Sequence, residues 1–263
     1  MDNISNSLES VPDRSLKGRI TMVLPFIVLT LLSILASPGY TIETQSVYME
    51  VSGDNVTVYV EPKRNVVVID SVFLVNASVA NIPSDGGEKG LHSYQFEVTY
   101  NNTVLEGINV TLPEGHFLTP EHPDNIFVVQ CRVNQTEGSV HLAVTLLYAV
   151  SVEPGKAGNG TLVTIAFKAK SVGNSSLSIV NPILSGPQSQ IYECEVLDGY
   201  LEVVSPDLNM DGKVNLEDLS LQKEAFGSYP ENPNWNILAD LNKDNIINIL
   251  DITLVAKEYG KTV

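Results

Sequence analysis

Much of the chain carries apolar residues at every second position, which is the pattern of β-strands with one buried face. The segment 91–100, LHSYQFEVTY, places Tyr94, Phe96 and Val98 on one face. Turns rich in Gly and Pro separate about nine such runs between residues 56 and 204, and no useful helical period appears among them. This region therefore predicts an antiparallel β-sandwich.

The pattern changes after Pro206. The segment 207–227, DLNMDGKVNLEDLSLQKEAFG, recurs without a gap 33 residues later as 240–260, DLNKDNIINILDITLVAKEYG. Each copy ends on a glycine, which suits a helix C-terminus. Apolar residues follow each DLN run at helical spacing: Leu216, Leu219 and Phe226 in one copy, and Ile252, Val255 and Tyr259 in the other. The duplication predicts a second, smaller domain of two loop-plus-helix units.

Each copy begins with oxygen-bearing side chains at alternate positions, as in a twelve-residue calcium loop. Gly212 occupies the sixth position of the first loop, and Asn245, which also tolerates left-handed backbone, occupies it in the second. We expect two structural Ca²⁺ ions, since closing the loops uses all of the ligands. The expected ligands are Asp207, Asn209, Asp211, the Lys213 carbonyl, Asn215 and Asp218, and in the second loop Asp240, Asn242, Asp244, the Ile246 carbonyl, Asn248 and Asp251.

Two details distinguish these loops from the general pattern. No helix precedes either loop, and the closing residue is Asp in place of Glu. The eighth position is apolar in both copies, at Val214 and Ile247, and we expect these two residues to pair across the loops. The sequence therefore predicts a loop with one exiting helix, not a helix–loop–helix hand.

The duplicated DLNxDxxxNxxD loops, each followed by one helix, resemble the type I-like dockerin module of cellulosome-type systems over residues 207–260. The resemblance implies a calcium-dependent module that binds a cohesin domain. It also assigns partner binding to the residues just after the ninth loop position, which are Leu216, Glu217, Ile249 and Leu250. These are not the Ser-Thr pair of some dockerins, and they favour a more hydrophobic docking face.

The segments 93–110, SYQFEVTYNNTVLEGINV, and 158–179, GNGTLVTIAFKAKSVGNSSLSI, resemble the cohesin family, as does the closing DGYLEVV. The resemblance implies a nine-stranded jelly-roll sandwich that receives a dockerin. Related carbohydrate-binding sandwiches share the architecture and stay open as an alternative. The expected fold is mostly β, with a cohesin-like sandwich at 41–205 and a small helical dockerin module at 206–263.

The first 40 residues are expected to lie outside the fold. Arg14, Lys17 and Arg19 precede the apolar run 20–36, and small residues follow it. This is typical of an export signal. Cleavage and retention as a membrane anchor both stay open, and both predict a secreted or cell-surface protein from Thr41 onward.

Two features agree with an exported chain. The two cysteines, Cys131 and Cys194, lie in strand-like contexts and are expected to pair in an oxidising compartment, with two buried thiols as the alternative. Seven N-x-S/T sequons predict glycosylation, although Asn and Thr are also common in β-rich secreted chains. The sequons start at Asn55, Asn76, Asn101, Asn109, Asn134, Asn159 and Asn174.

Charge and motifs narrow the function further. Asp and Glu outnumber Lys and Arg by 31 to 15, and the net charge of −16 excludes nucleic acid as a partner. The loop 112–125 groups Glu114, His116, Glu121, His122 and Asp124, but it lacks the short ligand spacing of a zinc site and is interpreted as an exposed connection. No nucleophile elbow, phosphate loop or two-carboxylate pair is present, so we expect no catalytic residues and no enzyme.

The sequence thus predicts a non-catalytic extracellular scaffold or adaptor that acts in calcium-dependent cohesin–dockerin assembly. A cohesin-bearing protein would bind the duplicated module, and a dockerin-bearing protein would bind the sandwich. The resemblance implies a setting of polysaccharide catabolism or surface attachment. The alternative is a carbohydrate-binding sandwich carried on a dockerin, and polysaccharide as a further partner stays open.

Overall fold

A computed structural model of the chain describes residues 45–47, 55–84, 89–120, 123–147 and 155–263. The described residues belong to one compact unit. The expected export segment falls outside the described residues. No helix in the described ranges combines the length and the apolar character needed to cross a membrane.

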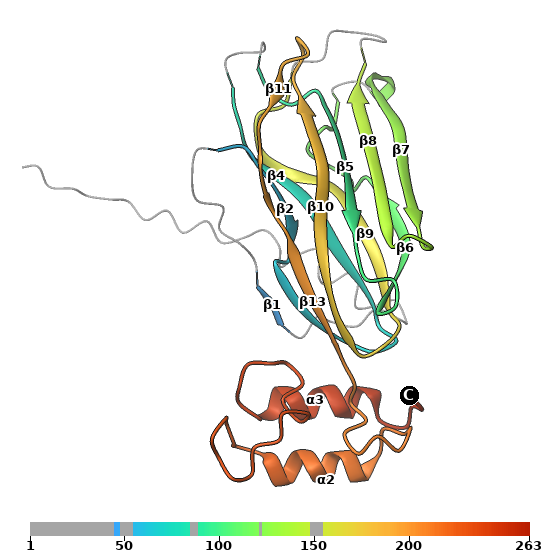
Figure 1. The fold of residues 1–263 in the computed structure, drawn as a ribbon, viewed down its shortest axis with the longest axis vertical. Helices are drawn as coiled ribbons and strands as arrows, with labels where there is room; N and C mark the ends of the chain where they lie inside the picture. The colour runs from blue at the N-terminus through green and yellow to red at the C-terminus, as the bar shows by residue number, and fades with distance from the viewer. Residues whose placement is uncertain (1–44, 48–54, 85–88, 121–122, 148–154) are drawn as a thin grey trace, which may run out of the picture. The chain divides into compact units, whose positions relative to one another are not determined.

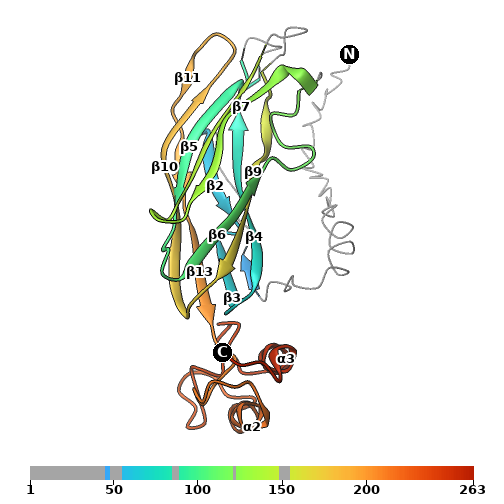
Figure 2. The same cartoon turned by 90° about the vertical axis from the view of Figure 1, so that its right-hand side faces the viewer.

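The strands form two sheets that lie as two layers (Figures 1 and 2). The eight-stranded sheet has the order β1-β3-β13-β10-β5-β8-β7, with β11 paired to β10, and the five-stranded sheet has the order β12-β2-β4-β9-β6. The strands are β1 Gln45–Val47, β2 Thr57–Glu61, β3 Arg64–Val68, β4 Val72–Ile82, β5 Ser93–Thr99, β6 Leu105–Thr111, β7 Ile126–Asn134, β8 Ser139–Leu146, β9 Gly158–Ala169, β10 Gly173–Ser185, β11 Ile191–Tyr192, β12 Glu195–Leu197 and β13 Gly199–Val204. A short 3-10 helix, η2 Pro123–Asn125, precedes β7. Most pairs are antiparallel, but β12–β2 and β13–β3 are parallel.

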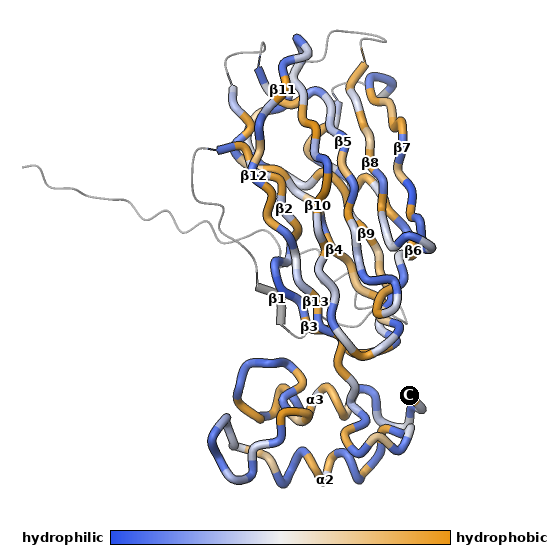
Figure 3. Tube along the Cα trace, viewed as in Figure 1, coloured by the Kyte–Doolittle hydropathy of each residue, from blue (hydrophilic) through white to orange (hydrophobic). Residues whose placement is uncertain are grey.

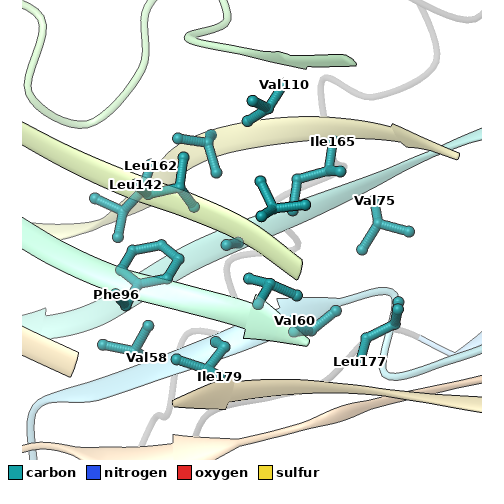
Figure 4. Packing of buried hydrophobic residues seen from close by; sticks show 14 of the residues in the cluster. Val58, Val60, Val75, Phe96, Val110, Leu142, Leu162, Ile165, Leu177 and Ile179 are labelled. Carbon is teal, nitrogen blue, oxygen red and sulfur yellow. The ribbon is translucent and has the colours of Figure 1, made fainter. Parts of the chain in front are cut away.

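The alternation of apolar and polar residues fills the space between the layers. Figure 3 shows this alternation along the strands, and Figure 4 shows side chains of both sheets pointing toward one another. Phe167 of β9 lies at the centre of an aromatic group, with its ring centroid 5.9 Å from that of Phe73 and 5.1 Å from that of Tyr100. Each fully buried side chain of this kind stabilises the fold by about 1.5–3 kcal/mol.

The expected β-sandwich is confirmed, but its strands differ in number and length from the expectation. The apolar run 66–79 has the sequence pattern of a single strand, but it is divided between β3 in one sheet and β4 in the other. Asp70, with φ of 65°, turns the chain between them, and the Ser71 hydroxyl donates to the Val68 carbonyl. The apolar pattern runs through this corner because residues on both sides of it are buried, so the pattern hides the break.

The helices of the duplicated module are α2 Leu216–Ala225 and α3 Ile249–Glu258, which lie side by side (Figure 1). Asn215 and Asn248 cap their N-termini, each in a capping box with the Asp three residues later. Gly227 and Gly260 follow the C-termini with left-handed backbone, as the sequence predicts. The buried cluster of the module includes Leu208, Val214, Ala225, Ala239, Leu241, Ile247, Leu254 and Val255.

The helical spacing of apolar residues identifies only some of the residues in this cluster. Of the apolar residues at helical spacing, Leu216, Phe226 and Tyr259 are exposed and lie outside the cluster. In α2 the buried side chains are Asp218, Gln222 and Ala225. Two of these three are polar, so a hydrophobic pattern does not detect them.

Candidate metal-binding loops and docking surfaces

Both loops curl through left-handed backbone at their fourth and sixth positions. In the first loop φ is 60° at Met210 and 84° at Gly212. In the second it is 60° at Lys243 and 67° at Asn245, which confirms that Asn takes the place of Gly there. The same two departures in both copies show that the duplicated sequence encodes one backbone shape.

The side chains of the early loop positions hold this curl by accepting backbone N–H bonds. Asp207 accepts from the N–H of Asp211 at 3.2 Å and from that of Gly212 at 2.8 Å. Asn209 Oδ1 accepts from Asp211, and Asp211 Oδ1 accepts from Lys213. The second copy repeats these bonds through Asp240, Asn242 and Asp244.

The closing Asp joins the start of each loop to the N-terminus of the following helix. Asp218 Oδ1 accepts from the N–H groups of Leu208 at 2.7 Å and Asn209 at 3.3 Å. Its Oδ2 accepts from Asn215 at 2.8 Å, which completes the capping box. In the second copy Asp251 makes the same three bonds, to Leu241, Asn242 and Asn248. Both carboxylates have no exposed surface.

Burial raises the pKa of Asp240 and of Asp251 above that of an ordinary carboxyl group. Desolvation is the main cause in both, because it penalises the charged form. Backbone N–H donors act in the opposite direction: Asn245 lowers the pKa of Asp240, and Asn248 lowers that of Asp251. The carboxylate of Asp244 raises both pKa values by like-charge repulsion.

The donor chemistry of the loops fits a hard cation such as Ca²⁺. Each loop offers carboxylate, amide and carbonyl oxygens and no sulfur or imidazole, which is the set that Ca²⁺ prefers. Within the described ranges, no group of three or more His, Cys, Asp or Glu side chains forms a metal site by itself. The Asp side chains face backbone N–H groups, and the other expected ligands are Asn side chains and backbone carbonyls.

The backbones of the two loops do not pair with each other at Val214 and Ile247, so the expected two-stranded pairing is wrong, although both residues belong to the same buried cluster. Val214 instead exchanges backbone hydrogen bonds with residues that follow α3, namely Gly260 and Lys261. Ile247 exchanges them with residues that follow α2, namely Gly227 and Ser228. Each loop is therefore tied to the end of the other repeat's helix.

All four residues assigned to partner binding are exposed on the module. They are Leu216, Glu217, Ile249 and Leu250, at the starts of α2 and α3. Glu217 Oε2 also accepts a hydrogen bond from Asn209 Nδ2 at 3.0 Å, so it lies against the first loop. The exposed start of α3 is more apolar than that of α2, because Leu250 stands where α2 has Glu217.

The sandwich presents an outward face that the sequence analysis did not single out. Across four neighbouring strands, Val180, Glu97, His141 and Arg132 stand in register, and His141 Nδ1 lies 3.8 Å from Glu97 Oε2. The next row of the same face includes Ala143, and exposed Ile183 of β10 lies nearby. Strand register brings these residues together from segments far apart, so no local motif reveals them.

The predicted disulfide between Cys131 and Cys194 is wrong, because both thiols are free. Cys194 directly precedes β12, whereas the Cys131 thiol donates to the Val110 carbonyl of β6. β12 and β6 are the opposite edges of the five-stranded sheet. At about 4.8 Å per strand spacing these edges lie roughly 19 Å apart, far beyond the reach of a disulfide.

The sequons and the histidine loop lie in different surroundings. Five sequon asparagines are exposed and two, Asn76 and Asn134, are half-buried. In the histidine loop Leu118 is fully buried and burial lowers the pKa of His116, so the loop is anchored in the fold and not wholly exposed as expected. Glu121 and His122 fall outside the described residues.

Family comparisons find a cohesin domain followed by a dockerin domain, the order that the sequence predicts. A model of the cohesin domain matches residues 60–188, and a model of the type I dockerin domain matches residues 205–258. No curated protein matches the chain.

Several solved structures are similar to part of the chain. The sixth cohesin of scaffoldin B from Acetivibrio cellulolyticus, solved with a Cel5 dockerin, is 16% identical, with a TM-score of 0.45 over 57% of this chain and 99% of that one. A non-cellulosomal cohesin from Archaeoglobus fulgidus is 14% identical, with a TM-score of 0.42 over 58% and 94%. The Coh-OlpC-Doc435 complex from Clostridium thermocellum is 11% identical, with a TM-score of 0.47 over 60% and 98%.

Proposed function

Because the chain carries a cohesin domain followed by a type I dockerin domain, we propose that it is an adaptor that links two different partner proteins. Cohesin and dockerin domains are non-catalytic assembly modules. The dockerin module would bind a cohesin-bearing protein, and the sandwich would bind a dockerin-bearing one. The observation that carries the proposal is the presence of both kinds of assembly domain on one chain.

Calcium would neutralise the carboxylates in the two loops of the dockerin module and so stabilise its fold. The twelve oxygens expected from the sequence would hold two ions, one in each loop. Three carboxylates in one small loop repel one another, so a bound divalent cation stabilises the curled form. The module is therefore expected to require calcium for docking, and none of its ligands is assigned a part in catalysis.

The partner-binding surface of the module would lie at the helix starts. Leu216, Ile249 and Leu250 expose apolar side chains that have more than half of their surface accessible. Ile249 and Leu250 are adjacent at the start of α3. Leu216, at the start of α2, instead lies beside the end of α3, because Val214 bonds to Gly260 and Lys261. Large exposed apolar residues at either helix start are typical of a protein interface. The surface is held by the loops, because the capping Asn of each helix is also the ninth residue of a loop.

The dockerin-bearing partner would bind the outward face of β10, β5, β8 and β7. This face combines exposed apolar side chains, such as Ile183 and Phe127, with the charged row that includes Glu97 and Arg132. Sequons lie on both outward faces, at Asn76 in β4 of the other sheet and at Asn134 in β7, two residues from Arg132. The choice of this face therefore rests on its apolar and charged side chains.

One experiment tests the dockerin half. The full chain is mixed with purified type I cohesin domains in calcium and in chelator, and complexes are measured by calorimetry. We expect binding in calcium, loss of binding in chelator, and loss in the double variant Asp211→Ala, Asp244→Ala. Equal binding of a cohesin by the double variant and the unmodified chain contradicts the assignment.

A second experiment tests the sandwich half against a panel of type I dockerins. Ala143→Arg places a bulky charge in the proposed face and is expected to abolish binding. Leu74→Arg, on the outward face of the other sheet, is the matched control, since Leu74 is also exposed. Binding that survives Ala143→Arg and fails in Leu74→Arg would move the interface to the five-stranded sheet.

The setting of this assembly is also part of the proposal. We place the protein outside the cell, as secreted or surface-attached, with glycans on the exposed sequons and a link to polysaccharide catabolism. The charge pattern of the N-terminal segment and the density of sequons support this. Mass spectrometry of the protein from its native source would show the processed N-terminus and any glycan masses, and an unprocessed, unglycosylated intracellular chain would contradict it.

A further inference from the structure

The two repeats of the dockerin module exchange the segments that complete their loops. The Val214 N–H donates to the Lys261 carbonyl at 2.9 Å, and the Gly260 N–H donates to the Val214 carbonyl at 2.8 Å. In the other half, the Ile247 N–H donates to the Ser228 carbonyl at 3.0 Å. The Gly227 N–H donates in turn to the Ile247 carbonyl at 2.8 Å. Neither Val214 nor Ile247 has exposed surface, so water cannot replace these bonds.

These bonds form a closed circuit through both loops. The first loop holds the N-terminus of α2 through Asp218, and the residues after α2 hold Ile247 in the second loop. The second loop holds the N-terminus of α3 through Asp251, and the residues after α3 hold Val214 in the first loop. Ordering one loop therefore orders the helix end that completes the other.

We propose that the two calcium loops bind their ions cooperatively, because each loop is completed by the backbone that follows the other repeat's helix. The inference rests on the proposed calcium binding and adds its regulation. A ligand that orders one loop lowers the conformational cost of ordering the second, which is positive coupling. The two helix starts, where the partner is proposed to bind, would then become ordered together over a narrow range of calcium concentration.

The two halves of the circuit differ in their number of backbone hydrogen bonds, and this difference provides a test. The first loop has a third bond, from the Val263 N–H to the Gly212 carbonyl at 3.1 Å. The residue equivalent to Val263 in the first repeat is Pro230, which has no N–H to donate. The module thus already accepts proline at this place in one repeat. Val263→Pro removes the third bond by making the second repeat resemble the first.

The coupling is measured by calcium titration of the stripped full chain and of two variants that disable one loop each, Asp211→Ala and Asp244→Ala. With coupling, the two association constants of the unmodified chain multiply to more than the product of those of the single-loop variants. Equal products show independent sites and overturn the inference while leaving calcium binding intact. A titration of the unmodified chain without any binding overturns the proposed calcium function itself.

The route of the coupling is tested by Val263→Pro, with Val263→Ala as the matched control that keeps the N–H. Loss of one backbone hydrogen bond is expected to weaken calcium binding at the first loop by about 2- to 10-fold. The alanine variant is expected to bind as the unmodified chain does. Identical affinities in the two variants overturn the route, provided that Trp235 emission in calcium shows both to be folded.

A direct measurement does not depend on the proline variant. In the Asp211→Ala chain, calcium binds only the second loop, and amide hydrogen exchange reports on the first. We expect calcium to slow exchange of the Val214 N–H, because that ion orders α3 and the Lys261 carbonyl that accepts the bond. Exchange of Val214 that is unchanged by calcium overturns the proposal.

Discussion

At the residue scale, the closing Asp of each loop is a structural residue as well as an expected ligand. Asp218 accepts three backbone N–H bonds and has no exposed surface. Asp211, in contrast, is exposed and takes one backbone bond, from Lys213. The two carboxylates fill equivalent roles in the ligand pattern, but only Asp218 connects the loop to the helix.

We therefore predict that Asp218→Ala destabilises the module even without calcium. The substitution leaves three backbone N–H groups without their acceptor, which costs about 2–4 kcal/mol of unfolding free energy. Urea unfolding of the full chain in chelator measures it through Trp235, the one tryptophan of the chain, which packs against the buried cluster of the module.

The matched control is Asp211→Ala, which is expected to change stability in chelator by less than about 1 kcal/mol, since its side chain is exposed. In calcium both variants are expected to lose stability, because both lack an expected ligand. Equal stability of the two variants in chelator would show that the buried bonds of Asp218 contribute nothing measurable.

The thiols give a second prediction at this scale. Burial raises the pKa of Cys131 and of Cys194, so a smaller fraction of each is thiolate at a given pH. Without reductant, we expect two alkylations per folded chain, slower at pH 8 than for a free cysteine peptide and faster as the pH rises. Intact mass after timed labelling measures the number and the rate of alkylations. A chain that takes up label only after reduction would contradict this prediction and support a disulfide.

At the scale of elements, the helices were predictable because their signals are local. The capping Asn, the Asp three residues later and the terminal Gly all act within one turn of the helix. The buried face of each helix was not predictable in the same way, because it depends on what packs against it. Gln222 is buried because its Nε2 donates to the Ala239 carbonyl, a contact that helical spacing does not reveal.

We predict that Gly227→Ala and Gly260→Ala each destabilise the module by about 1 kcal/mol, because an alanine is strained in left-handed backbone. A methyl group at either position meets no atom within 4 Å, so the effect is one of backbone alone. Trp235 fluorescence during urea unfolding measures the change.

Gly115→Ala is the matched control for these two glycines. Gly115 also has left-handed backbone, with φ of 71°, and a methyl group there would also meet no atom within 4 Å. Unlike the other two glycines, Gly115 lies in the sandwich. We expect it to leave the Trp235 transition where it is. A shift of that transition by Gly115→Ala would show that the two domains unfold together.

At the scale of the whole molecule, one chain carries both kinds of assembly domain. If they matched each other, contacts between copies would be heterologous and would build open chains or rings. We predict that the full chain in calcium stays monomeric as its concentration rises, since the proposed role is to link different partners. Sedimentation velocity measures this, and calcium-dependent oligomers that the double variant Asp211→Ala, Asp244→Ala abolishes would contradict it.

The sequence by itself determined the parts whose signals are local or repeated: the alternating strands, the two oxygen-rich loops, their exiting helices and the left-handed Asn245. Only the tertiary structure decided which distant segments meet. It separated Cys131 from Cys194, aligned Glu97 with His141 and Arg132, and paired Val214 with Gly260 rather than with Ile247. The physical reason is that alternation and capping depend on neighbours along the chain, whereas strand order and helix-end pairing depend on how separate elements pack to bury their apolar faces.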